Sequence, residues 1–164
     1  MITGGQRSGK SRYAEEIAEQ EADRPLYLAT ARIWDQDFAE RIRHHRQNRG
    51  ANWRTIEEEI NISRHMLSGE TVLLDCITLW LTNIFFDHRF NVEDSLTFAK
   101  EEWNNFTGQS MTLIVVTNEL GMGVHPENES GRKFADLQGL MNRHIAETAD
   151  SVFLMVSGIP VKIK

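Results

Sequence analysis

Cysteine is almost absent from this sequence. Cys76 is the single cysteine among 164 residues, which excludes an intrachain disulfide and a cysteine metal cluster. A chain of this length buries roughly 70% of its unfolded surface, so it needs no such cross-link to fold. A reduced cysteine fits a reducing compartment, and we expect a cytoplasmic protein.

Long apolar runs and a surplus of positive charge are also missing. No run approaches the ~20 apolar residues that cross a membrane, and no signal peptide precedes the first motif, so we expect no membrane span. The formal net charge is −6, whereas broad nucleic-acid binding usually requires a basic surface, so we expect no nucleic-acid partner. Repeats and linkers are absent too, which predicts one domain over residues 1–164.

A glycine-rich motif begins at residue 4. Residues 4–11 fit the pattern G-x-x-x-x-G-K-[ST] at every fixed position, between a short apolar run and a helical pattern. In such a loop the backbone N–H groups surround phosphate oxygens, the lysine reaches the β- and γ-phosphates, and the serine hydroxyl can bind Mg²⁺. We therefore predict a nucleoside triphosphate site formed by Gly4, Gly5, Gln6, Arg7, Ser8, Gly9, Lys10 and Ser11.

Apolar runs alternate with helical patterns along the chain. This alternation indicates βαβ units and predicts an α/β, P-loop NTPase-like (RecA-like) three-layer fold with a mainly parallel sheet. We expect strands at 1–3, 25–30, 53–56, 71–75, 111–117 and 152–156, and an antiparallel C-terminal edge strand at 161–163. We expect helices at 9–21, 35–48, 60–67, 77–88, 92–106 and 132–148. The first strand is short for a buried strand, as if the natural start lay a few residues upstream.

Asp75 follows the apolar run 71–74. A carboxylate at the end of such a strand can hold Mg²⁺, directly or through water, opposite the serine of a phosphate loop. An aspartate that only caps the next helix would give the same pattern. Beside the phosphate loop the metal interpretation is favoured, with Ser11 and Asp75 as the Mg²⁺ ligands.

An arginine-rich segment covers residues 41–49, with four arginines around two adjacent histidines. The planar guanidinium group suits phosphate oxygens. On a helical wheel His45 continues the apolar stripe of positions 34, 38 and 42, whereas His44 lies roughly 120° away. His44 is therefore free to face a ligand, and a neutral imidazole can attack phosphorus. The alternative is that both histidines are ordinary surface or packing residues of a basic helix.

Asn118 and Glu119 follow the predicted strand at 111–117. In a parallel sheet they would lie at the same carboxyl edge as the phosphate loop and Asp75, where ligands bind. Glu119 could position a substrate or accept a proton, or the pair could simply cap the loop. The glycine-bearing loop that continues to Gly131 is long enough to serve as a lid.

Taken together, these motifs resemble the bifunctional adenosylcobinamide kinase/adenosylcobinamide-phosphate guanylyltransferase family of cobalamin biosynthesis. The phosphate loop alone would be generic, but the paired histidines, the run Thr-Asn-Glu-x-Gly-Met-Gly and the C-terminal tail are specific. The matching segments are residues 3–12, 27–30, 41–46, 53–57, 73–78, 116–123 and 156–164.

The resemblance implies roles for individual residues. In that family the first histidine of the pair carries the guanylyl group, and by position this is His44. It also implies nucleotide contacts at Ala31, Arg32, Ile33, His45, Arg46, Gln47, Asn48, Glu57 and Asp75. Some relatives have glutamate in place of Asp75, and the shorter aspartate would then reach the nucleotide or metal through water.

The resemblance also implies a reaction sequence. ATP or GTP would phosphorylate adenosylcobinamide, and GMP from GTP would then pass through a guanylyl-histidine to adenosylcobinamide phosphate. Mg²⁺ and a homotrimeric assembly are implied as well. Two alternatives stay open, namely a small-molecule kinase without the histidine step and a nucleotide-dependent regulatory module.

Overall fold

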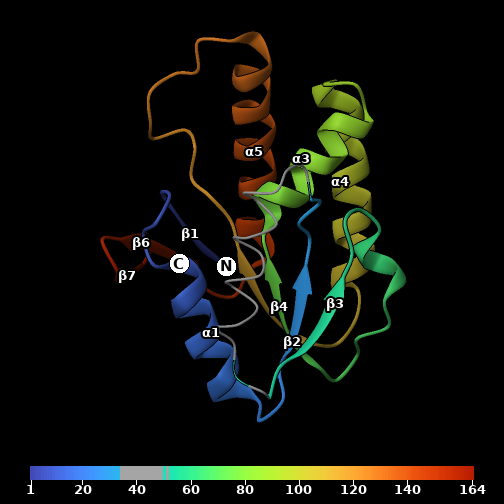
Figure 1. The fold of residues 1–164 in the computed structure, drawn as a ribbon, viewed down its shortest axis with the longest axis vertical. Coiled ribbons are helices and arrows are strands. Elements are labelled where there is room, and N and C mark those ends of the chain that lie inside the picture. Colours follow the sequence, from blue (N-terminus) through green and yellow to red (C-terminus); the bar gives the residue numbers. More distant parts are fainter. Residues whose placement is uncertain (34–49, 51) are drawn as a thin grey trace.

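One mostly parallel sheet runs through the protein. The computed structural model describes residues 1–33, 50 and 52–164 (Figure 1). Among these residues the sheet has seven strands in the order β3-β2-β4-β5-β1-β6-β7. All neighbours pair in parallel except β6 and β7, which are antiparallel, so the predicted fold class is confirmed. The strands are β1 (Ile2–Gly4), β2 (Leu26–Ala29), β3 (Arg54–Glu57), β4 (Thr71–Asp75), β5 (Thr112–Val116), β6 (Phe153–Val156) and β7 (Ile159–Lys162).

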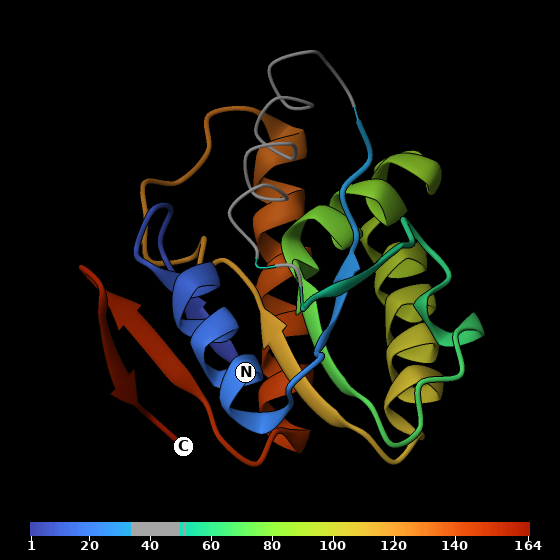
Figure 2. The ribbon, with the colours of Figure 1, turned by 60° about the horizontal axis from the view of Figure 1, so that its bottom comes forward.

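Helices cover both faces of the sheet (Figures 1 and 2). On one face α1 (Lys10–Glu21) packs Ala14 and Ala18 against Leu73 and Val116. On the other face lie α3 (Ile77–Asp87), α4 (Val92–Thr107) and α5 (Glu129–Thr148). The result is the three-layer arrangement of P-loop NTPase-like folds. Each of these helices is too short or too polar to span a bilayer.

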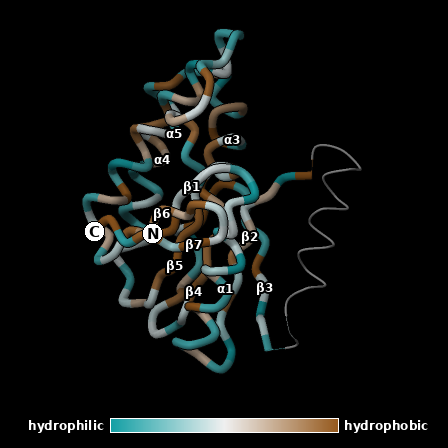
Figure 3. Tube along the Cα trace, turned by 90° about the vertical axis from the view of Figure 1, so that its left-hand side faces the viewer, coloured by the Kyte–Doolittle hydropathy of each residue, from teal (hydrophilic) through white to brown (hydrophobic). Residues whose placement is uncertain are grey.

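The central strands are buried from both sides. Val72, Leu73 and Leu74 of β4 are all 0% exposed, and they alternate between the two cores. Such a strand needs apolar side chains on both faces, which explains the continuous apolar run in the sequence. In Figure 3 the hydrophobic stretches accordingly concentrate in the strands at the centre of the molecule.

Three predicted elements differ from the structure. The helix expected at 60–67 is only a 3₁₀ turn, η1 (Ile62–Arg64), because the Glu58 carboxylate takes up the N–H groups just before it. Helix α5 begins at Glu129 instead of residue 132, because the Asn128 side chain accepts the Gly131 N–H and caps the helix. The last strand covers Ile159–Lys162, so it begins two residues before the predicted 161–163. The helix predicted at 35–48 lies outside the described residues.

The buried, ionised carboxylate of Glu58 stabilises the 3₁₀ turn η1. Its carboxylate is 5% exposed, accepts the N–H groups of Ile60 and Asn61, and pairs with Arg64 at 2.6 Å and His65 at 3.2 Å. Burial favours the neutral acid, but these partners outweigh it and hold the Glu58 pKa below its ordinary value. A lowered pKa gives stability that is present above the unfolded pKa and is lost as the pH falls through the folded value.

We therefore expect Glu58→Gln to lower the free energy of unfolding at pH 7 by about 1–3 kcal/mol, because charged hydrogen bonds are lost. The difference from wild type should shrink as the pH falls from about 5 toward 2, where Glu58 is protonated in both states. Urea unfolding at several pH values measures it. Glu101→Gln, at an exposed position of α4, is the matched control. A difference that stays constant with pH would contradict the electrostatic explanation.

Candidate nucleotide site at the carboxyl edge of the sheet

The predicted site segments meet at one edge of the sheet. The registers align Glu57 with Ala29, Ala29 with Asp75, and Asp75 with Val116, so β2, β3, β4 and β5 end in one row. The phosphate loop follows β1, which pairs with β5. Segment 31–33 follows β2. The topology therefore brings residues 4–11, 31–33, 57, 75 and 117–119 to the same edge, where ligands of parallel sheets bind.

The phosphate loop has the backbone conformation that its glycines permit. Gly4 has φ +149° and Gly9 has φ +93°, and α1 begins directly after Gly9 at Lys10. A Cβ atom at Gly4 would lie 2.7 Å from the Met155 carbonyl oxygen. The free N–H groups at the start of α1 form an anion site of the kind that binds phosphate.

The turn between β6 and β7 contacts the phosphate loop. The Gly158 N–H donates to the Ser8 carbonyl at 3.0 Å, and a Cβ atom on Gly9 would lie 3.3 Å from the Gly158 Cα. The C-terminal tail, singled out in the sequence only as a family motif, is thus in contact with the loop. Sequence reasoning gave the tail no such role, because its residues are remote from the loop along the chain.

Lys10 lies inside the loop. It is 8% exposed, and its Nζ donates to the Gly5 carbonyl at 2.6 Å. Burial lowers the Lys10 pKa, and the nearby Asp75 carboxylate opposes that shift. The ammonium group is therefore held within electrostatic reach of Asp75, where phosphate oxygens can replace the Gly5 carbonyl as its partner.

Asp75 does not cap the next helix. The N-cap of α3 is Cys76, and the Asp75 Oδ2 instead accepts a hydrogen bond from the Tyr27 hydroxyl at 2.8 Å. The Thr30 hydroxyl binds both the N–H and the carbonyl of Cys76, which fixes the chain directly after the carboxylate. Burial raises the pKa of the Cys76 thiol to about 12, so this thiol stays neutral and is no nucleophile.

The Arg32 side chain is engaged with two carboxylates. Its Nε donates to Glu59 at 2.6 Å, and Nη1 and Nη2 donate to the two Asp87 oxygens at 2.9 and 3.0 Å. The hydrogen bond to Asp87 raises the Arg32 pKa, and the same contact lowers the pKa of Asp87. A nucleotide contact of Arg32 therefore requires its main chain or an exchange of these ion pairs.

Several predicted residues are not brought into contact with the loop by the described structure. Glu57 is exposed at the end of β3, the edge strand of the sheet. Ile33 is 64% exposed. His44, His45, Arg46, Gln47 and Asn48 lie outside the described residues, so their roles stay predictions.

A buried polar network beside β5 was missed by the sequence analysis. The Thr117 hydroxyl donates to Asn142 Oδ1 at 2.7 Å, and Gln138 Nε2 donates to Thr117 Oγ1 at 2.9 Å. Thr117 is 0% and Gln138 1% exposed. The sequence does contain a pattern that indicates this network. Two amides four residues apart, Gln138 and Asn142, lie beside the apolar stripe of Leu137, Met141 and Ile145.

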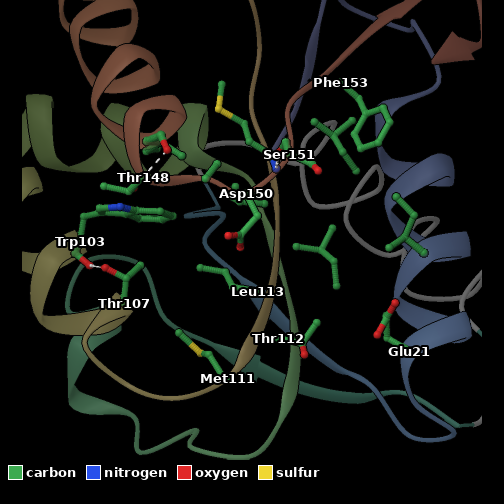
Figure 4. A pocket seen from close by; sticks show the side chains of 17 residues that line it. Glu21, Trp103, Thr107, Met111, Thr112, Leu113, Thr148, Asp150, Ser151 and Phe153 are labelled. Carbon is green, nitrogen blue, oxygen red and sulfur yellow. Dashed lines mark hydrogen bonds between the residues drawn. The ribbon is translucent and has the colours of Figure 1, made fainter. Parts of the chain in front are cut away.

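A cavity of about 660 Å³ lies at the opposite edge of the sheet, where β1 and β5 begin. Trp103, Met111, Leu113 and Asp150 surround it in Figure 4. Of the predicted site residues that the structure describes, none lines this cavity. It is therefore separate from the nucleotide site.

Comparison with known proteins agrees with the sequence motifs. The family described as "Cobinamide kinase / cobinamide phosphate guanyltransferase" matches residues 1–163. "Bifunctional adenosylcobalamin biosynthesis protein CobU" of Escherichia coli is 41% identical, covering 100% of this chain and 98% of that protein. The protein of the same name in Salmonella typhimurium is 37% identical, over 100% and 98% of the two chains. "Bifunctional adenosylcobalamin biosynthesis protein CobP" of Pseudomonas aeruginosa is 37% identical, over 100% and 96%.

Proposed function

The chain belongs to the cobinamide kinase / cobinamide phosphate guanyltransferase family of bifunctional enzymes, and on this premise we propose that one nucleotide site, within a single domain of residues 1–164, serves both of its reactions. The observation that carries the proposal is the phosphate loop, with Lys10 bound to the Gly5 carbonyl and Asp75 at the same sheet edge. In the first reaction, ATP or GTP gives its terminal phosphoryl group to the aminopropanol hydroxyl of adenosylcobinamide. In the second, GTP supplies GMP to the phosphorylated corrinoid.

Mg²⁺ fits the oxygen groups of this site. Mg²⁺ prefers oxygen ligands and is often held by one or two side chains together with substrate phosphates and water. The Ser11 hydroxyl, on the first turn of α1, and the Asp75 carboxylate are the side chains that would hold it. When bound, the ion neutralises negative charge on the phosphates. Lys10 contributes to the same neutralisation from within the loop.

His44 is the proposed nucleophile of the second reaction. Its imidazole attacks the α-phosphate of GTP, the N–P bond forms, and pyrophosphate leaves. The phosphate of the corrinoid then attacks the guanylyl-histidine, which releases adenosylcobinamide-GDP and frees His44. Family membership supports this step, together with the arginines beside His44 that suit phosphate oxygens.

Labelling with GTP that carries ³²P at the α-phosphate tests the covalent step. We expect acid-labile, base-stable label on the wild type. His44→Ala should lose the label and at least about 10³-fold of guanylyl transfer, while it keeps kinase activity, because only the nucleophile is removed. His125→Ala, at an exposed position of the loop after β5, is the matched control. Unlabelled wild type would favour the alternative of a kinase without the histidine step.

Two further parts of the proposal concern assembly and setting. We expect a homotrimer, which light scattering after size-exclusion chromatography would measure. We also propose a cytoplasmic setting, since an enzyme that consumes ATP and GTP works where both are supplied. The regulatory-module alternative is tested by turnover, since such a module would not release phosphorylated cobinamide.

A further inference from the structure

The strand order places the end of β5 between the two phosphate-binding elements. β5 lies between β1, which leads into the phosphate loop, and β4, which ends at Asp75. The residues that follow β5, up to Glu119 three positions beyond Val116, therefore leave the sheet between these two elements, since adjacent strands lie roughly 5 Å apart. Glu119 is the acidic residue in this position.

Hydrogen bonds to α3 and α5 fix the chain that leads to Glu119. The Asn118 N–H donates to the Thr78 hydroxyl of α3 at 3.0 Å. The Asn118 carbonyl accepts from Asn142 Nδ2 of α5 at 3.0 Å. Asn142 also accepts from the buried Thr117 hydroxyl. Residues 117 and 118 are thus fixed before the chain enters the exposed loop.

Glu119 is attached to the phosphate loop itself. Its N–H donates to the Gly4 carbonyl at 3.1 Å, which continues the contact between the ends of β5 and β1. Its Oε1 accepts the Gly121 N–H at 2.8 Å. Within the described part of the chain no hydrogen bond engages Oε2, so one oxygen is held and the other is available to a ligand.

The other carboxylates at this edge are less suited to receive a proton from a substrate. Asp75 is bound by the Tyr27 hydroxyl and lies near the Lys10 ammonium, which favours a role with metal and phosphate. Glu57 ends β3, four strand positions from β1, a separation of roughly 19 Å. Glu119, in contrast, is hydrogen-bonded to the phosphate loop through its main-chain N–H.

We propose that Glu119 is the catalytic base of the phosphorylation step, an inference that rests on the proposed function. The acceptor hydroxyl gives its proton to Glu119 Oε2 as its oxygen forms a bond to the γ-phosphorus. The bond from that phosphorus to the β,γ-bridging oxygen breaks, and the nucleoside diphosphate leaves with that electron pair. Guanylyl transfer needs no such base, because its acceptor is a phosphate that is already ionised.

Glu119→Gln tests this assignment. Glutamine keeps an oxygen for the Gly121 N–H but cannot take up a proton. We expect phosphorylation of cobinamide to fall about 10²- to 10⁴-fold, the usual contribution of a general base. Guanylyl transfer to supplied cobinamide phosphate, the affinity for GTP and the melting temperature should stay at wild-type values. Glu127→Gln removes the same charge from an exposed position of the same loop and should leave both reactions unchanged.

Three results would overturn the assignment. One is a phosphorylation rate of Glu119→Gln within about threefold of wild type. Another is an equal loss in both reactions, which would indicate structural damage instead of a missing base. If Glu119→Gln does not fold, Glu119→Asp provides the test, because it keeps the carboxylate and should retain more kinase activity than Glu119→Ala. The third result that would overturn the assignment is a folded Glu119→Asp variant whose kinase activity is no higher than that of Glu119→Ala. A wild-type protein that does not phosphorylate cobinamide would instead refute the proposed function.

Discussion

Lys10→Ala is expected to abolish both reactions. The side chain is buried in the phosphate loop, where its Nζ donates to the Gly5 carbonyl, and the lysine of this motif is the one that reaches the β- and γ-phosphates. Removing one such electrostatic contact typically costs 10²- to 10³-fold in rate, so we expect kcat/KM to fall by at least about 10²-fold for phosphorylation and for guanylyl transfer alike. Initial rates with each corrinoid substrate measure the two effects separately.

Comparing the loss of phosphorylation with the loss of guanylyl transfer in Lys10→Ala tests whether one nucleotide site serves both reactions. Lys162→Ala removes an exposed positive charge from β7 and should leave both rates unchanged. The melting temperature of Lys10→Ala should be no lower than that of wild type, because a partly desolvated charge is removed. If phosphorylation falls and guanylyl transfer does not, a second nucleotide site must serve the second reaction, and the single shared site is wrong.

The sheet was largely predictable because each strand carried its own local signal. Residues 72–74 and 113–116 are apolar at consecutive positions, which strands buried on both faces require, and they lie in β4 and β5. Helix α1 was predictable from the motif, since a phosphate loop must lead into a helix. Its buried face is formed by Ala14 and Ala18, with Tyr13 and Ile17 partly buried beside them.

The errors arose where a single side chain decides the local structure. The apolar pattern at 60–67 suggested a helix, but Glu58 binds the N–H groups of Ile60 and Asn61 and turns the chain. Such a contact depends on burial of a carboxylate, which the sequence pattern does not reveal. The start of α5 was missed for a similar reason, since the Asn128 cap outweighs the glycine at 131.

The candidate site was predictable as a set of strand ends, but not in its contacts. Asp75 and the phosphate loop are at one edge, as a parallel sheet requires. The partners of Arg32 were not predictable, because Glu59 and Asp87 come from distant parts of the chain. The support of the loop by Gly158 likewise depends on how β6 aligns with β1.

Gly4→Ala is expected to destabilise the protein strongly. Residue 4 has φ +149°, which an L-amino acid rarely adopts, and the new Cβ would lie 2.7 Å from the Met155 carbonyl and 2.9 Å from Ser8 Oγ. β1 pairs with β6 at this point, so relief of the clash must separate two central strands. Backbone strain and overpacking together should cost about 2–5 kcal/mol of unfolding free energy. Thermal unfolding measures the loss, and a fall of roughly 5–15 °C is expected.

Gly5→Ala separates this explanation from a general sensitivity of the loop. A Cβ atom on Gly5 has no neighbour within 4 Å, so the free energy of unfolding should stay within about 0.5 kcal/mol of wild type. The two glycines are adjacent and receive the same methyl group, but only Gly4 has a positive φ and close neighbours around the new Cβ atom. Equal destabilisation of both variants would therefore refute the clash with Met155. If Gly4→Ala alone loses stability, and GTP binding with it, the contact between β1 and β6 is what holds the phosphate loop in its binding conformation.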